Sequence, residues 1–299
     1  MRGLAIAHDF FTSWGYPFLN SKFPDLASRV AAGRFLGSDV LAGDDEISRD
    51  HDWGPQFDLF LSAADYALFG ERLSQAMNGA APDSWSGYRL AGAGDKSVRV
   101  ESIPAWFATY LGLERLPVSA ADWPPVHFES TLYFLRHGKL WMDATGEFSM
   151  WRTALQEYPE ERLRIRLAEE CFRVWHHGEY NFVQRISHRG DPIAISICLG
   201  EFATGIMRIL LLMSRDFAPY WKWLAFELRK RPEAQAYLNL LEELFSIRDI
   251  DCQVAILRRL CGLVHEELME RGWVTGRDAK PYLLPLLNDK IELEGPKSH

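Results

Sequence analysis

The stretch Arg34–Trp53, RFLGSDVLAGDDEISRDHDW, contains the two motifs that indicate the fold and the site of this 299-residue chain. The run Val30–Leu36, which leads into it, predicts a short β-strand. Gly37 and Ser38 then form a turn, where small residues let backbone N–H groups and a hydroxyl approach the phosphates of a ligand. We therefore expect one half of a nucleotide site at Gly37 and Ser38.

The second half is the acidic motif Asp50-His51-Asp52, at the start of a strand-like run whose later part, Phe57–Leu61, is apolar. Side chains alternate between the two faces of a strand, so Asp50 and Asp52 are predicted to share one face. Two carboxylates on one face suit Mg²⁺, which prefers oxygen ligands. A D-x-D pair alone also fits a solvated strand edge. Its position after the Gly-Ser turn favours a metal–nucleotide site.

This order of motifs resembles the nucleotidyltransferase superfamily that includes the aminoglycoside and lincosamide nucleotidyltransferases. The longer stretch GSDVLAGDDEISRDHDWGP resembles the signature of a largely uncharacterised bacterial branch of that superfamily. The resemblance implies Mg²⁺-dependent transfer of NMP from an NTP, foremost ATP, to a hydroxyl or similar acceptor with release of pyrophosphate. Asp50 and Asp52 would hold Mg²⁺, and Gly37 and Ser38 would cradle the phosphates.

A third acid is expected on a later strand. The segment Ser97–Ile103, SVRVESI, alternates and predicts a strand with Val98 and Val100 on the face opposite Arg99 and Glu101. In the superfamily a third acid completes the metal site or acts as general base, and the resemblance assigns that role to Glu101. A solvent-facing glutamate on an edge strand fits the same pattern, so both roles stay open.

Lys222 is the candidate cation. It lies in Tyr220-Trp221-Lys222-Trp223, where bulky aromatic residues on both sides would hold its stem. The branch carries a similar P-Y-x-K-W segment, which implies a contact between Lys222 and the triphosphate. The alternative is a lysine whose stem covers an aromatic surface while its ammonium stays in water.

Two other acidic segments fit structural roles better. Asp44, Asp45 and Glu46 could coordinate a metal, but an exposed acidic loop is favoured. Asp143 ends a strand-like segment before Ala144-Thr145-Gly146 and could approach the site, although a turn-forming aspartate is favoured.

Hydrophobic periodicity predicts an α+β chain. A nucleotidyltransferase-fold mixed sheet with flanking helices is expected over residues 1–150 and an all-α helical bundle over 151–299, with the active site in the cleft between them. Residues 78–96 are dense in Gly, Ala, Pro, Asp and Ser and predict a long loop. Helices are expected at Arg152–Trp175, Asp191–Ser214, Phe217–Lys230, Glu233–Phe245 and Asp249–Arg271.

The net charge of the chain limits the kinds of partner that we expect. The net charge of −8 and pI near 5.6 disfavour a broad nucleic-acid surface, so a small-molecule acceptor is favoured and tRNA is the one nucleic acid kept open. The apolar start is interrupted at His8 and Asp9, and the longest apolar run is too short for a bilayer. A cytoplasmic bacterial protein without a membrane partner is therefore expected. The four cysteines are expected to be buried free thiols: Cys171, Cys198, Cys252 and Cys261.

Two further functions compete with small-molecule transfer. One is a nucleotide-binding or regulatory pseudoenzyme, which binds the NTP without transferring it. The other is a component of toxin–antitoxin type that nucleotidylates a protein or tRNA. The oligomeric state does not follow from the sequence.

Overall fold

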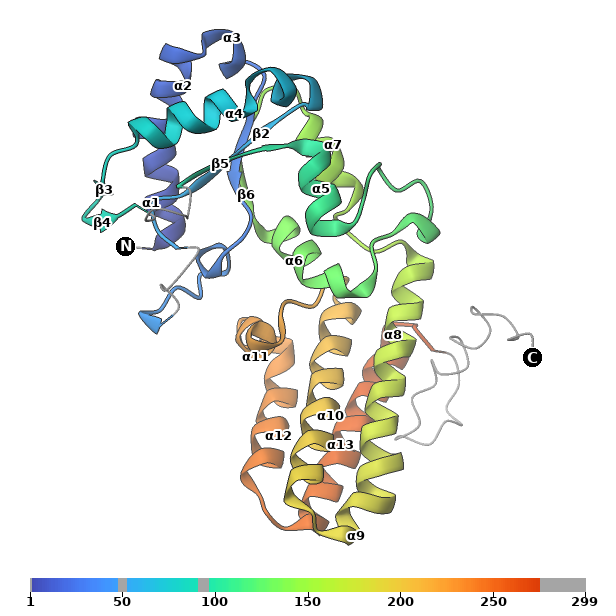
Figure 1. Ribbon diagram of the computed structural model, residues 1–299. Coiled ribbons are helices and arrows are strands. Elements are labelled where there is room, and N and C mark those ends of the chain that lie inside the picture. The colour runs from blue at the N-terminus through green and yellow to red at the C-terminus, as the bar shows by residue number, and fades with distance from the viewer. Residues whose placement is uncertain (1, 48–52, 91–96, 275–299) are drawn as a thin grey trace. The chain divides into compact units, whose positions relative to one another are not determined.

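The structure, a computed structural model, describes residues 2–47, 53–90 and 97–274. The chain forms two compact units, Met1–Gln156 and Glu157–His299 (Figure 1). It is a mixed α+β chain with a small mixed sheet in the first unit and a helical second unit. The units separate after Gln156, so α7 (Glu147–Ala154), which a boundary after residue 150 would divide, belongs to the first.

The first unit is built on a four-stranded sheet with the order β5-β2-β1-β6. β1 is antiparallel to both of its neighbours, whereas β2 and β5 run parallel to each other. The parallel pair is joined by a crossover through α4 and a small hairpin, as parallel strands require. The strands are β1 (Ala31–Arg34), β2 (Phe57–Leu61), β5 (Val98–Ser102) and β6 (Lys139–Asp143).

Each face of the sheet carries its own core. One face packs Phe57, Leu59, Val98 and Val100 against the N-terminal helical segment. The opposite face carries an aromatic cluster, in which the ring centres of Phe60 and Phe148 lie 4.4 Å apart. Helices cover both faces (Figure 1), which explains why β2 is buried along its whole length. These helices are α1 (Gly3–Phe10), the π-helix η1 (Phe11–Gly15), α2 (Tyr16–Lys22), α3 (Pro24–Ala27), α4 (Ala63–Ala80), α5 (Ile103–Leu111), α6 (Glu129–His137) and α7.

The described part of residues 78–96 is not the long loop that the sequence predicts. α4 extends to Ala80, and β3 (Ser84–Trp85) pairs with β4 (Tyr88–Arg89) in a short hairpin. Ser86 and Gly87 both have positive φ, the backbone that a tight two-residue hairpin turn needs. The hairpin is tied down by Trp85, whose Nε1 donates to Oδ2 of Asp9 at 2.8 Å.

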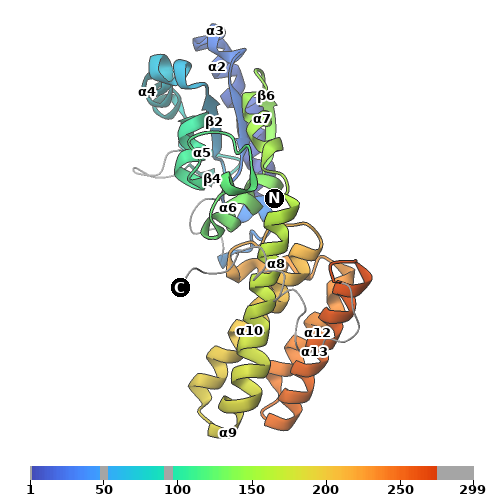
Figure 2. The same ribbon diagram turned by 90° about the vertical axis from the view of Figure 1, so that its right-hand side faces the viewer.

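The second unit is helical. α8 and α10 pack along each other, and α10 also packs against α13, which pairs with α12 (Figure 2). The charges inside are paired, since buried Glu170 accepts from Arg166 at 2.9 Å and from Arg208 at 3.1 Å. The helices are α8 (Glu160–Trp175), the π-helix η6 (His176–Ile186), α9 (Ser187–Arg189), α10 (Pro192–Met213), η7 (Trp221–Trp223), α11 (Leu224–Leu228), η8 (Pro232–Ala234), α12 (Gln235–Ser246) and α13 (Ile250–Glu270).

Four details of this unit differ from the expectation. The helix predicted over Phe217–Lys230 begins only at Trp221 and consists of the 3₁₀ helix η7 followed by the short helix α11, which ends at Leu228. The helix predicted over Arg152–Trp175 is two helices, because α7 ends at Ala154 and α8 begins only after Pro159, which occupies its N-cap position. Cys252 is exposed, whereas Cys171, Cys198 and Cys261 are buried. α10 is the one helix among the described residues that is long and apolar enough to cross a membrane, and its buried side packs within the bundle.

Candidate functional site

The Gly37-Ser38 turn follows β1 directly. Gly37 has φ 115° and ψ 158°, a conformation that side chains with a Cβ rarely adopt, and Ser38 begins a 3₁₀ helix, η2 (Ser38–Leu41). Behind the turn, the fully buried Arg34 donates through Nε to Oδ2 of Asp39 at 3.3 Å and through Nη1 to Oε1 of Gln56 at 3.4 Å. Burial raises the pKa of Asp39, against the opposing effect of Arg34. These contacts fix the turn to the chain that enters β2.

Asp44 has a structural role. Its Oδ2 accepts from the backbone N–H of Gly3 at 2.6 Å and from Nε1 of Trp53 at 3.2 Å. A carboxylate at the first N–H groups of a helix is stabilised by the helix dipole. Asp44 therefore connects the start of α1 to Trp53, and its neighbours Asp45 and Glu46 are exposed as expected for an acidic loop.

The D-x-D motif, Asp50 and Asp52, lies outside the described residues. The described part of the strand-like run predicted from Asp50 is not extended throughout: β2 begins at Phe57, and Gly54 has φ 100°. The prediction of one long strand is wrong for Trp53–Gln56, because Gly54 takes a left-handed conformation and Pro55 follows it.

Glu101 lies on β5 as predicted, and Val98 and Val100 are buried on the opposite face. It is half-buried and shares its face with Asp58 of β2 and with Arg99. Nε of Arg99 donates to Oδ1 of Asp58 at 2.7 Å. Desolvation, and then the nearby charge of Asp58, raise the pKa of Glu101, although Arg99 opposes the shift.

Asp58 is a carboxylate that the sequence reasoning missed. It is a lone charged residue in the apolar run Phe57–Leu61, and strand alternation puts it on the face opposite Phe57 and Leu59. That interruption is the signal that could have revealed it. A buried aspartate inside a strand needs a partner, and Arg99 supplies one.

The strand register orders these groups relative to the Gly-Ser turn. Gly33 pairs with Asp58 and Ala31 pairs with Phe60. Phe60 in turn pairs with Glu101, whereas Asp58 pairs with Arg99. Asp58 is therefore nearer the end of β1 than Glu101 by two residues, about 7 Å along the strand. Because β1 and β2 are antiparallel, the end of β1 and the start of β2 lie at the same end of the sheet along the strand direction.

Lys222 lies in the second unit, in the 3₁₀ helix η7. It is exposed, and its Nζ lies 5.1 Å from the centre of the Trp223 ring. The expected enclosure between aromatic residues is wrong for Trp221, which is 65% exposed. Lys222 therefore contacts one aromatic face and keeps its ammonium in water.

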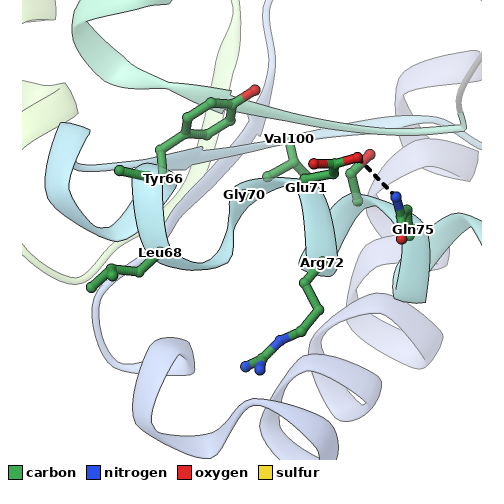
Figure 3. A pocket seen from close by; sticks show the side chains of 9 residues that line it. Tyr66, Leu68, Gly70, Glu71, Arg72, Gln75 and Val100 are labelled. Atoms are coloured by element: carbon green, nitrogen blue, oxygen red, sulfur yellow. Dashed lines mark hydrogen bonds between the residues drawn. The ribbon is translucent and has the colours of Figure 1, made fainter.

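A surface hollow of about 880 Å³ lies along α4 (Figure 3). It is lined by α4 side chains and Val100, and Glu71 accepts from Gln75 within it at 3.0 Å. Arg72 extends away from Val100 (Figure 3). Of the predicted site residues that the structure describes, Gly37, Ser38, Glu101 and Lys222, none lines this hollow.

Asp143 forms a turn, as favoured. Its Oδ1 accepts from the N–H of Gly146 at 3.0 Å and its Oδ2 from that of Ser149 at 2.7 Å. Both oxygens thus hold the entry to α7. Within residues 2–47, 53–90 and 97–274, no three His, Cys, Asp or Glu side chains gather in a way that could hold a metal ion.

Residues 126–224 match the model of a domain of unknown function, DUF4037. The match runs from just before α6 through the end of the first unit and into the second as far as Leu224. It includes Lys222 but not the Gly37-Ser38 turn, Asp50, Asp52 or Glu101. The comparison with curated proteins gave no match.

Proposed function

We propose that this chain is a Mg²⁺-dependent nucleotidyltransferase that transfers NMP from an NTP, foremost ATP, to an acceptor hydroxyl or similar group and releases pyrophosphate. The observation that carries the proposal is the antiparallel pairing of β1 with β2. It brings the end of β1, which leads to Gly37 and Ser38, beside the start of β2, which the D-x-D motif precedes in sequence. A turn that can cradle phosphates, at the same end of the sheet as the start of the strand that the D-x-D motif precedes in sequence, suits an NTP with its Mg²⁺.

Each residue has a role in this proposal. Asp50 and Asp52 would ligate the metal, whose charge stabilises the phosphates during in-line attack. The N–H groups and hydroxyl of Gly37 and Ser38 would hold the β- and γ-phosphates. Lys222 would neutralise charge on the leaving pyrophosphate.

Glu101 would either complete the metal site or accept the proton of the acceptor hydroxyl. The second role is supported by the raised pKa of Glu101, because a carboxyl group with a raised pKa is a stronger base than an ordinary one. The acceptor we favour is a small molecule, consistent with the net charge of −8.

The first test is calorimetry with each NTP, with and without Mg²⁺, on the wild type and on the double variant Asp50→Ala/Asp52→Ala. We expect binding that depends on Mg²⁺ and is lost in the double variant. Glu46→Gln is the matched control, because Glu46 is an exposed acid of the preceding loop and its replacement should leave binding unchanged. Absence of binding to every NTP would overturn the proposal.

A second candidate is a nucleotide-binding module without transfer. The observation that favours it is the position of Glu101. Glu101 lies farther than Asp58 from the end of the sheet where β1 ends. This module would bind Mg²⁺-NTP with the same dependence on Asp50 and Asp52 but release no pyrophosphate with any acceptor. A coupled assay for pyrophosphate across a panel of hydroxyl-bearing acceptors separates the two.

A further inference from the structure

The segment Tyr220–Lys222 presents two exposed aromatic rings. Trp221 is 65% exposed and Tyr220 is 50% exposed, and their ring centres lie 5.5 Å apart. Large aromatic side chains normally contribute to a core, and exposed ones are enriched where proteins bind partners or ligands. These two rings therefore need an explanation other than packing.

The segment is anchored on both sides. Phe217 and Ala218 before it and Leu224 after it are buried. The N–H of Trp223 donates to the carbonyl oxygen of Tyr220 at 2.8 Å, which closes the turn. Further along, an ion pair between Arg231 and Asp216 joins the two ends of the surrounding chain. Groups presented on a preorganised turn lose little conformational freedom when a ligand binds.

Lys222 adds a positive charge beside the rings. Its ammonium lies over Trp223, and it has no carboxylate partner among the residues that the structure describes. The nearby Lys230, by contrast, is paired with Glu227 at 2.6 Å. An unpaired ammonium next to exposed rings is complementary to a ligand that joins a planar base to an anion.

We propose that the Tyr220–Lys222 turn binds a free nucleotide, with Trp221 stacking on the nucleobase and Lys222 contacting a phosphate. This inference rests on the proposed function, because the ligand is the NTP of that reaction, and it assigns recognition of the base to Trp221 in the second unit. A nucleotide fits better than a nucleic-acid strand, because the turn offers a platform for a single base and the chain carries a net charge of −8.

The experiment compares Mg²⁺-ATP with Mg²⁺-tripolyphosphate, which has the phosphates but no base. Trp221→Ala should weaken ATP binding between about fivefold and a hundredfold and leave tripolyphosphate binding unchanged, since only the stacked base is lost. Trp221→Phe should restore most of the ATP affinity. Lys222→Gln should weaken both ligands alike.

Phe245→Ala is the matched control, because Phe245 is another exposed aromatic residue of the same unit, at 55%, and should not affect either ligand. If the wild type binds Mg²⁺-ATP and Trp221→Ala binds it equally well, the stacking inference is wrong and the proposed function stands. Equal losses for ATP and tripolyphosphate in Trp221→Ala would also overturn it, as would tighter binding of a single-stranded oligonucleotide than of ATP. If the wild type binds no NTP, the proposed function itself fails.

Discussion

Asp58 and Arg99 are cross-strand partners on the parallel strands β2 and β5, and the Arg99 guanidinium donates to the Asp58 carboxylate at 2.7 Å. The side chain of Asp58 is 7% exposed and that of Arg99 is 22% exposed. The pair lets an aspartate sit inside an apolar strand, and it sets the charge environment of Glu101.

Asp58→Asn should destabilise the first unit. Removing one charge from a largely buried pair leaves the other poorly compensated, so the free energy of unfolding should fall by about 1–3 kcal/mol, reduced from the fully buried case because Arg99 is partly solvated. Urea denaturation measures this. The control is Glu242→Gln, which breaks the exposed pair with Arg229 and should cost less than about 1 kcal/mol. Equal effects of the two variants would contradict the prediction.

Glu101→Gln should stabilise the protein at neutral pH. The folded pKa of Glu101 is raised above its ordinary value of 4.5, so the folded state binds more protons than the unfolded state in the interval between the two pKa values. Stability therefore falls as the pH rises through that interval, and the non-titrating glutamine avoids this loss.

The measurement for Glu101→Gln is thermal unfolding of variant and wild type at matched pH values. Below the ordinary carboxyl range their difference should vanish, and above the raised pKa it should be complete. A variant that is less stable than the wild type at pH 7 would show that the ionised Glu101 is stabilised by its surroundings. If instead the variant is more stable, as we expect, the ionised Glu101 lowers the stability of the fold, which fits a residue retained for function.

Gly37→Ala should destabilise the Gly37-Ser38 turn. At φ 115° a residue with a Cβ is strained, which costs about 1–3 kcal/mol. Gly200 is the opposite case: it lies in α10 with open space around the position of a Cβ, so Gly200→Ala should stabilise by about 0.5–1 kcal/mol. Denaturation curves of both variants check the pair, and a neutral Gly37→Ala would count against the assigned turn.

Cys252 should be the one thiol of the four that reacts with a disulfide reagent in the native state. The hydrogen bond to Asp249 and the charge of that carboxylate raise the pKa of Cys252, so its reaction should be slow at neutral pH and accelerate as the pH rises. Asp249→Ser keeps an N-cap acceptor for α13 but removes the charge, and should speed the reaction. The buried Cys171 and Cys261 should react only on unfolding.

Local pattern predicted the elements well where one face of an element is buried. The alternation of Ser97–Ile103 gave the strand β5 with Glu101 on the face opposite the valines, and Asp191-Pro192 marked the start of α10. The role of Asp143 as a turn residue also followed from its place before Gly146.

What could not be predicted depends on contacts between distant segments. The pairing of Asp58 with Arg99 requires the parallel register of two strands that α4 separates. The structural role of Asp44 depends on Gly3 and Trp53, which no short window contains. The exposure of Trp221 does not follow from the sequence for a related reason, since an aromatic-rich sequence gives no sign of which ring stays exposed.

The position of β6 in the sheet has a consequence for folding. β1 lies near the beginning of the first unit, yet one of its two partners is β6, near the end of that unit. During synthesis that side of β1 stays without its partner until almost the entire first unit has been made. Non-local pairing of this kind slows folding, and unpaired strand edges promote association between chains. Chains interrupted before residue 139 should therefore aggregate, and expression of such fragments should yield insoluble protein.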